Sequence, residues 1–201
     1  MTWINVIAYE NATGRLKKLY DRVKGPDDNV DNIMLAHGLR PHTMEAHMTM
    51  YKYVLHHSAN VLEKWYLEAI GVYVSWLNAC HYCVDHHFEG LIAESADREK
   101  AMKIRAGFET RQYGGALTDR EEAGLSYAGQ LTRNPSAITK SEIEKLRGSG
   151  FDDGEILEIN QVTAYFNYAN RTVLGLGITT SGDVLGLAPR RSENPDDWNH
   201  G

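Results

Sequence analysis

The strongest structural signal in the chain lies at residues 62–91, which read LEKWYLEAIGVYVSWLNACHYCVDHHFEGL. Residues 62–77 are apolar at most positions and lack the strict alternation of a half-buried strand, which predicts a long, strongly apolar helix. Asn78 follows this helix and is suited to cap the next one, because its side chain can accept a hydrogen bond from a free backbone amide. We therefore expect two successive helices, the second ending near Glu94.

Helical patterns also occupy the chain on both sides of this stretch. Thr118 and Glu121 have the form of a capping box, and Asp152 is suited to cap a last long helix to about Asn170. No segment alternates as a strand does, no repeat is evident, and the loops are short. The sequence predicts one all-α domain, a helical bundle with its core at about 13–175 and an irregular tail at 176–201 that docks on a neighbouring subunit. The other predicted helices cover residues 13–24, 33–39, 42–57, 97–108 and 141–146.

Composition narrows the class of protein. The 201 residues carry 21 Lys and Arg against 27 Asp and Glu, a net charge of −6, which argues against nucleic acid as the main partner. Two cysteines cannot build a disulfide-rich secreted scaffold. The longest charge-free apolar stretch, residues 69–84, is too short and too polar to span a bilayer, and the start lacks the pattern of a secretory signal. We expect a cytoplasmic protein without a membrane partner.

The two cysteines form a C-x-x-C pair, Cys80 and Cys83, at the expected start of a helix. Side chains at i and i+3 on a helical turn are neighbours, with Cβ atoms about 5–6 Å apart, so modest adjustment brings the sulfurs within disulfide range. Backbone amides at a helix N-terminus favour thiolates. This pattern predicts a redox-active pair.

His87 distinguishes the two cysteines. It follows Cys83 by four residues, on the same helical face, and follows Cys80 by seven, about 10 Å along the axis. Spacing therefore favours Cys83 as the nucleophile, with His87 as its proton acceptor and Cys80 as the resolving cysteine. An opposing argument is that the N-terminal cysteine of such pairs is often the more exposed and acidic one.

Glu68 stands twelve residues before Cys80 in an otherwise apolar stretch. A carboxylate embedded there needs a partner or a proton, which suits a group that passes protons. The alternative is a carboxylate that caps a helix or lies at the surface.

Together these residues resemble a known signature. Glu68, Cys80, Cys83 and His87 have the spacing of the AhpD-like alkylhydroperoxidases, within the carboxymuconolactone decarboxylase superfamily. The wider stretches 39–44 and 78–87 resemble its uncharacterised peroxidase-related branch. The resemblance covers most of the chain and is strongest at about residues 40–91.

The resemblance implies an all-helical fold that oligomerises through its helices, and the reduction of organic hydroperoxides. It also implies roles: Cys83 attacks the peroxide and becomes a sulfenic acid, Cys80 condenses with it to a disulfide, and Glu68 and His87 form a proton relay. A dithiol or a thioredoxin-like protein resets the pair. No cofactor or metal is implied.

One position departs from the family pattern. The best-known members carry a histidine immediately before the second cysteine, where this chain has Tyr82. A tyrosine can donate a hydrogen bond, but with a pKa near 10 it is a poor base at neutral pH. Tyr82 and His86 are therefore assigned as supporting residues.

Three alternatives accompany this interpretation. Cys80, Cys83, His86 and His87 have the composition of a zinc site, but adjacent histidines lie about 100° apart on a helix and cannot easily both face the thiols. A non-catalytic thiol-disulfide redox sensor of the same fold would use the same pair. Decarboxylase chemistry leaves the cysteine pair unexplained. The other histidines of this region, His42, His47, His56 and His57, are interpreted as surface, interface or pocket-wall residues.

Overall fold

The computed structural model describes residues 2–189, 191–194 and 197–198. Within them the chain is all-α and contains no strand, as the sequence predicted; a single β-bridge pairs His57 with Ser192. Short 3-10 turns lie at Tyr9–Asn11, Pro26–Asp28 and Pro135–Ala137. The helices are α1 (Gly14–Val23), α2 (Asn32–His37), α3 (Pro41–Leu55), α4 (Lys64–Leu77), α5 (His81–Ser95), α6 (Arg98–Thr110), α7 (Asp119–Arg133), α8 (Lys140–Gly148) and α9 (Asp153–Leu176).

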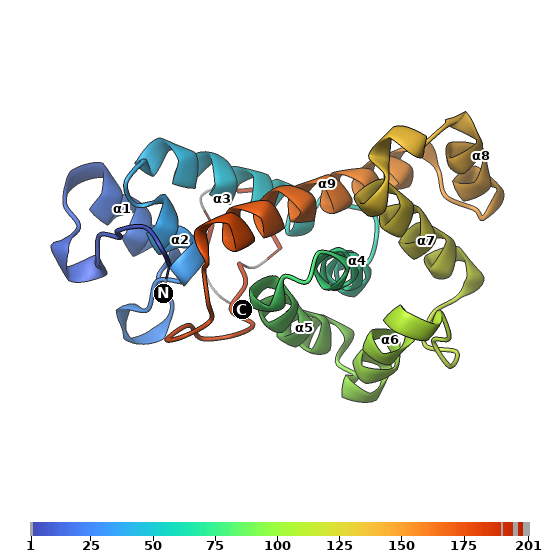
Figure 1. Ribbon diagram of the computed structural model, residues 1–201, viewed down its shortest axis with the longest axis horizontal. Coiled ribbons are helices and arrows are strands. Elements are labelled where there is room, and N and C mark those ends of the chain that lie inside the picture. The colour runs from blue at the N-terminus through green and yellow to red at the C-terminus, as the bar shows by residue number, and fades with distance from the viewer. Residues whose placement is uncertain (1, 190, 195–196, 199–201) are drawn as a thin grey trace.

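Helix α4 is the centre of the fold. It is seen nearly end-on in Figure 1, with α5, α7 and α9 around it, and its most extensive contacts are with α5. Every residue from Tyr66 to Ser75 is buried, which agrees with the strongly apolar helix that the sequence predicted. A helix apolar on all sides can be stable only when other helices cover every face.

A glycine brings α9 against α4. A Cβ atom at Gly71 would lie 2.2 Å from the ring of Phe166, so only glycine admits this side chain. The Phe166 ring in turn meets the edge of the His87 ring, with centroids 4.6 Å apart. The close packing of α4 and α9 thus fixes one wall beside His87.

The prediction that Asn78 caps α5 is wrong. Asn78 ends α4, Ala79 adopts the left-handed conformation with φ of 55°, and Cys80 is the N-cap of α5. Left-handed backbone cannot continue a helix, so the chain turns at Ala79. The Asn78 amide instead donates to the side chain of Asn170, at 2.9 Å, and to Asn167, at 3.1 Å.

The other two predicted capping signals are confirmed. Thr118 with Glu121, and Asp152 with Glu155, form reciprocal capping boxes at the starts of α7 and α9. Helix α9 continues six residues beyond the predicted end near Asn170 and stops at Leu176, before the left-handed Gly177. Its extra turns carry Val173 to the cysteine pair.

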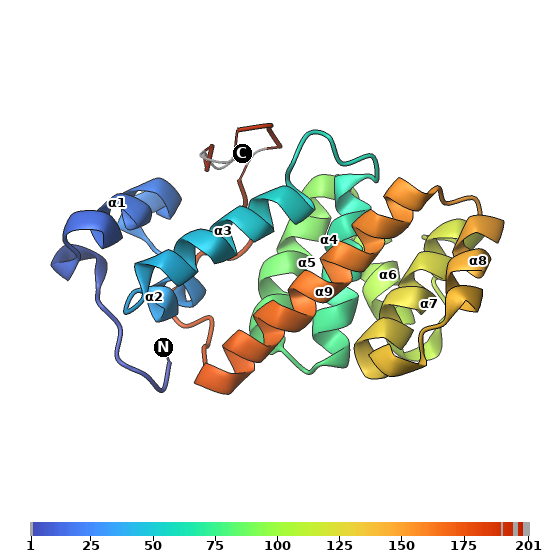
Figure 2. The same cartoon turned by 90° about the horizontal axis from the view of Figure 1, so that it is seen from above.

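The described part of the tail after α9 packs on its own chain. Figures 1 and 2 show it leaving α9 and running back past α2 and α5. Asp183 contacts Asn32 at the start of α2, and the tail residue Gly186 lies against Glu89 of α5. Of the predicted tail, residues 190, 195–196 and 199–201 lie outside the described residues.

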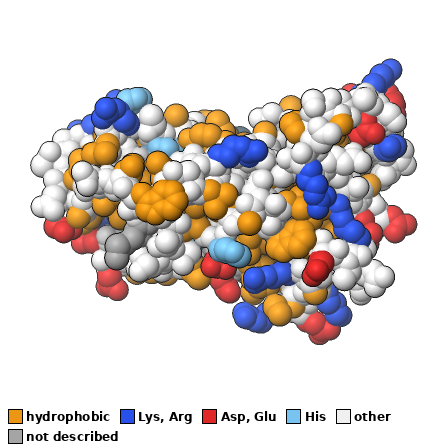
Figure 3. Space-filling model, in the orientation of Figure 1, with side chains coloured by type: hydrophobic (Ala, Val, Ile, Leu, Met, Phe, Trp, Pro, Cys, Tyr) orange, Lys and Arg blue, Asp and Glu red, His pale blue; other side chains and the backbone are white. Residues whose placement is uncertain are grey.

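Apolar side chains gather on the face shown in Figure 3, over the region where the end of α9 meets α2. Large exposed apolar residues in and beside these helices are Leu174 of α9, Leu39 just after α2, and Trp3 of the N-terminal segment. The expected oligomer remains a prediction.

Candidate active site

The cysteine pair sits at the junction of α4 and α5. The Cys80 amide donates to the carbonyl oxygen of Ser75, at 2.9 Å, which ties the N-cap to the end of α4. Both cysteines are free and buried, and their Sγ atoms are 3.0 Å apart in hydrogen-bond contact. The two sulfurs therefore need only a small movement to form a disulfide.

The two thiols differ in acidity. A hydrogen bond from the Cys83 thiol lowers the pKa of Cys80 against the effect of burial, and the Cys83 backbone amide and the Asn170 side chain lower it further. The same thiol-thiol bond, together with burial, raises the pKa of Cys83. Cys80 thus loses its proton first, which agrees with the argument that the N-terminal cysteine is the more acidic one.

Glu68 and His87 meet across α4 and α5. Glu68 Oε2 lies 2.8 Å from His87 Nδ1, and the glutamate is 1% exposed. The carboxylate is in mid-helix and buried, so it is neither a cap nor a surface group. Because Nδ1 faces Glu68, Nε2 is the ring nitrogen that can exchange a proton with a neighbouring molecule.

Gly90 makes room for the Glu68 carboxyl group. A Cβ atom at this position would lie 3.3 Å from the Glu68 carboxyl carbon and 3.4 Å from both oxygens. Gly90 follows His87 by three residues on α5, so the same helical face supplies the histidine and the space for its carboxylate. The geometry of the pair therefore depends on a glycine that the sequence analysis did not single out.

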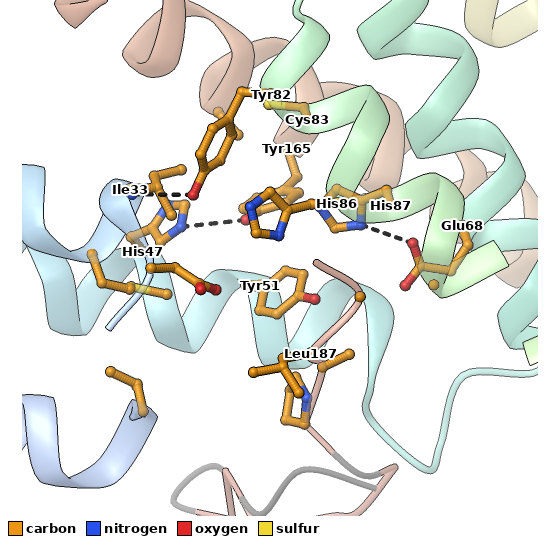
Figure 4. Close-up of a pocket in the computed structure, with 18 of the residues that line it drawn as sticks. Ile33, His47, Tyr51, Glu68, Tyr82, Cys83, His86, His87, Tyr165 and Leu187 are labelled. Carbon is orange, nitrogen blue, oxygen red and sulfur yellow. Dashed lines mark hydrogen bonds and ion pairs between the residues drawn. The ribbon is translucent and has the colours of Figure 1, made fainter. Parts of the chain in front are cut away.

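A cavity of about 70 Å³ lies beside these residues (Figure 4). Cys83, His87 and Glu68 line it, and Cys83 is the cysteine that contributes to its wall. Three of the four predicted catalytic residues therefore line the cavity, whereas Cys80 does not and lies behind Cys83.

The wall opposite the relay comes from α3 and α9. His47 Nε2 lies 3.5 Å from the Tyr165 hydroxyl, and His47 Nδ1 has no hydrogen-bond partner among the described residues. Burial lowers the pKa of His47 to about 3, so this histidine is neutral. Burial also holds the pKa of Tyr165 well above its usual value, with the nearby Cys83 acting in the same direction. This wall offers uncharged hydrogen-bonding groups.

The tail closes another side of the cavity and is held there by Asp183. The Tyr82 hydroxyl donates to Asp183 Oδ2 at 2.8 Å, and His86 Nε2 lies 3.2 Å from the same oxygen. The Tyr82 hydroxyl also accepts from the Ile33 amide at 3.2 Å. Tyr82 and His86 thus contact the tail rather than the Glu68–His87 pair. The tail residues of the wall are Gly186, Leu187, Ala188 and Pro189.

Glu68 also lines a second, larger cavity of about 330 Å³. Lys64, Glu94 and Arg191 contribute charged side chains to its wall, and Gly90 lines both cavities. The Glu68 carboxyl group therefore lies between the cysteine-lined cavity and a polar one.

The charges around the first cavity are acidic. Asp31 and Glu68 line it, and among its described lining residues there is no lysine or arginine. Within the part of the chain that the structure describes, no group of three potential ligands is arranged to hold a metal ion. His86 and His87 face separate carboxylates, Asp183 and Glu68. In the same part, no helix is long and apolar enough to cross a bilayer.

Residues 41–120 match the model of the carboxymuconolactone decarboxylase family, and this stretch contains Glu68, both cysteines and His87. No curated protein matches the sequence of this chain.

Solved structures with AhpD-like folds resemble this chain. One is an uncharacterised peroxidase-related protein from Ralstonia eutropha JMP134 with an alkylhydroperoxidase AhpD core, at a TM-score of 0.77 and 22% identity. Another, from Silicibacter sp. TM1040, has a TM-score of 0.75 and 24% identity. A third is the debrominase Bmp8 in complex with 2,3,4-tribromopyrrole, at 0.72 and 18%. Each match covers 89% of this chain and 91% of the other. These likenesses establish the AhpD-like fold.

Two side chains of the site, Tyr165 and Asp183, carried no sequence signal. Tyr165 falls in the apolar stripe of α9 and reads as core. Asp183 lies in an irregular tail, far from α5 in sequence. Asn170 had a usable signal, since a polar residue on a buried helical stripe needs a partner, as Glu68 does.

Proposed function

We propose that this protein is a cysteine-based peroxidase that reduces organic hydroperoxides. The observation that carries the proposal is the joint position of Cys83: it lines a cavity, touches Cys80, and shares the cavity wall with the Glu68–His87 pair. These are the parts that a dithiol peroxidase needs, namely a reachable sulfur, a resolving sulfur and a proton source.

The first step uses the hydrogen bond between the thiols. As the Cys83 sulfur attacks the terminal peroxide oxygen, its proton passes to the Cys80 thiolate 3.0 Å away. The O–O bond breaks, Cys83 becomes a sulfenic acid, and the leaving alkoxide takes a proton through His87 and Glu68. The reactive thiolate thus forms at Cys83 although Cys80 is the more acidic cysteine.

The second step closes the pair. The Cys80 sulfur attacks the Cys83 sulfenic acid, water leaves with the Cys80 proton, and the disulfide forms. A dithiol or a thioredoxin-like protein then reduces it by thiol-disulfide exchange. Because Cys83 lines the cavity, we expect the reductant to attack this sulfur first.

Turnover of three proteins tests the proposal. The wild type should consume tert-butyl hydroperoxide with a dithiol reductant. Cys83→Ser should lose turnover, by 1,000-fold or more, because it lacks the nucleophile. Cys80→Ser should stop at a sulfenic acid on Cys83, detected by mass spectrometry after a sulfenate-selective reagent. Full turnover by Cys83→Ser would show that the assignment is wrong.

The debrominase among the structural neighbours suggests a second candidate, reductive dehalogenation of an aromatic substrate. Aromatic rings supply much of the cavity wall here: Tyr51, Tyr82, Tyr165 and Trp198. Bromide release from a brominated pyrrole in the presence of a dithiol, compared with peroxide turnover under the same conditions, decides between the two substrates.

Two other functions are less favoured. A redox sensor would oxidise slowly and change its oligomeric state, so rapid turnover with unchanged elution in size-exclusion chromatography excludes it. A decarboxylase must bind a carboxylate, whereas the described residues lining the cavity offer two carboxylates and no lysine or arginine. Decarboxylation also leaves the cysteine pair without a role.

A further inference from the structure

Tyr165 and the reacting Cys83 line the same cavity. Tyr165 is 4% exposed, lines the cavity from α9, and lies on the cavity side of Cys83 in Figure 4. Cys83 is the charged neighbour that most affects it, whereas for Tyr51, another tyrosine of the wall, that neighbour is Glu68. Tyr165 is thus the cavity hydroxyl most closely coupled to Cys83.

The Tyr165 hydroxyl is protonated and makes only a long hydrogen bond. Burial holds its pKa well above the usual value, so it is a hydrogen-bond donor at any working pH. Its one hydrogen-bond contact among the described residues is His47 Nε2 at 3.5 Å, the long end of the range. A donor with so weak a partner can turn toward a ligand at little cost. By contrast, the Tyr82 hydroxyl is held by Asp183 and the Ile33 amide.

Peroxide cleavage needs such a donor. When Cys83 attacks the terminal oxygen, the electron pair of the O–O bond stays on the other oxygen, which leaves as an alkoxide. A preorganised donor aimed at developing negative charge typically contributes about 10²–10³-fold to a rate. His87 lies on one side of Cys83, and the described residues on the other side include no lysine or arginine to stabilise that charge.

We propose that Tyr165 is a catalytic residue whose hydroxyl donates a hydrogen bond to the oxygen that leaves the peroxide. The inference rests on the proposed peroxidase function. The sulfur–oxygen bond forms as the O–O bond breaks, Tyr165 stabilises the alkoxide, and the Glu68–His87 pair supplies the proton that converts it to an alcohol. His47 holds the hydroxyl in the resting site and gives it up when the substrate binds.

The leaving group provides the test. Tyr165→Phe keeps the ring and removes the donor. Its kcat/KM for tert-butyl hydroperoxide, which releases a strongly basic alkoxide, should fall about 100-fold. Its kcat/KM for peracetic acid, which releases a weakly basic carboxylate, should stay within about 3-fold. A purely structural role would lower both rates equally.

Two controls keep the result interpretable. Tyr168→Phe removes a half-exposed hydroxyl from the same helix, whose ring also contacts His47, and should change neither rate. Reaction of Cys83 with an aromatic disulfide forms no alkoxide, so Tyr165→Phe should react at the wild-type rate. Equal loss on both peroxides, or no loss on either, overturns the role of Tyr165. A wild type that turns over neither peroxide overturns the peroxidase itself.

Discussion

Two groups of histidines differ in the groups that surround them. His86 and His87 on α5 each face a carboxylate, Asp183 and Glu68. His47 on α3 and His56 after it are buried at least as deeply, and burial lowers the pKa of both. Burial without a carboxylate partner produces a neutral histidine, whereas His86 and His87 each have a carboxylate within hydrogen-bond distance. Only the α5 group is suited to a proton relay.

The largest expected effect is a loss of stability at low pH, caused by the buried histidines that lack a carboxylate partner. An unfolded histidine binds a proton below about pH 6.5, whereas folded His47 stays neutral down to about pH 3. The unfolded state therefore binds more protons as the pH falls, and the free energy of unfolding decreases. His47 alone should cost about 2 kcal/mol between pH 7.5 and 5, and the lowered pKa values of His37 and His56 add to this. Urea denaturation at both pH values measures the loss.

Two variants of α3 sharpen this prediction. His47→Phe should reduce the pH-dependent loss by about 2 kcal/mol, whatever its effect at pH 7.5. His42→Phe, on the exposed face of the same helix, should leave the loss unchanged. An unaltered pH dependence in His47→Phe would mean that His47 is protonated in the folded state.

Removing the carboxylate that faces His87 should impair the proton relay. Glu68→Gln keeps the shape of the side chain but cannot stabilise a charged His87, so kcat for tert-butyl hydroperoxide should fall about 100-fold. Steady-state kinetics measure it, with Glu99→Gln on the surface of α6 as the matched control. A Glu68→Gln protein with wild-type kcat would remove the relay from the mechanism.

The smallest effect is expected at Asp183, the carboxylate in the tail that faces His86. Asp183→Ala leaves the Tyr82 hydroxyl and the Asn32 amide without their acceptor, at a cost of roughly 1–2 kcal/mol. Hydrogen exchange of the Asn32 amide should accelerate about 10-fold, while amides in α7 stay protected. Unchanged exchange at Asn32 would show that Asp183 does not hold the tail in solution.

Local patterns predicted the helices well and the site in part. Capping boxes, apolar stripes and the C-x-x-C spacing depend on neighbours in sequence, and the structure brings Glu68 to His87 and Cys80 to Cys83. The start of α5 was predicted wrongly because Asn78 is as suitable for ending a helix as for capping one. Which role it takes is decided by its contacts with Asn167 and Asn170, about ninety residues away.

The opposite wall of the cavity could not be predicted from the sequence. Tyr165 and His47 become a pair only when α3 packs beside α9, and the tail reaches α5 through Asp183 and Gly186. Such contacts between distant segments leave no periodicity, and a tyrosine in an apolar stripe has the same pattern whether it faces core or cavity. Asn170 could have been found, because a buried amide demands a partner just as Glu68 does.

Glu68 lines both cavities, so its carboxyl group can carry protons between them. Cys83 lines the smaller cavity, whereas the Glu68 carboxyl group, which lines both, can take a proton on one face and release it on the other. When substrate fills the smaller cavity and displaces its water, Glu68 offers a route by which the proton used in the reaction is replaced from the polar cavity.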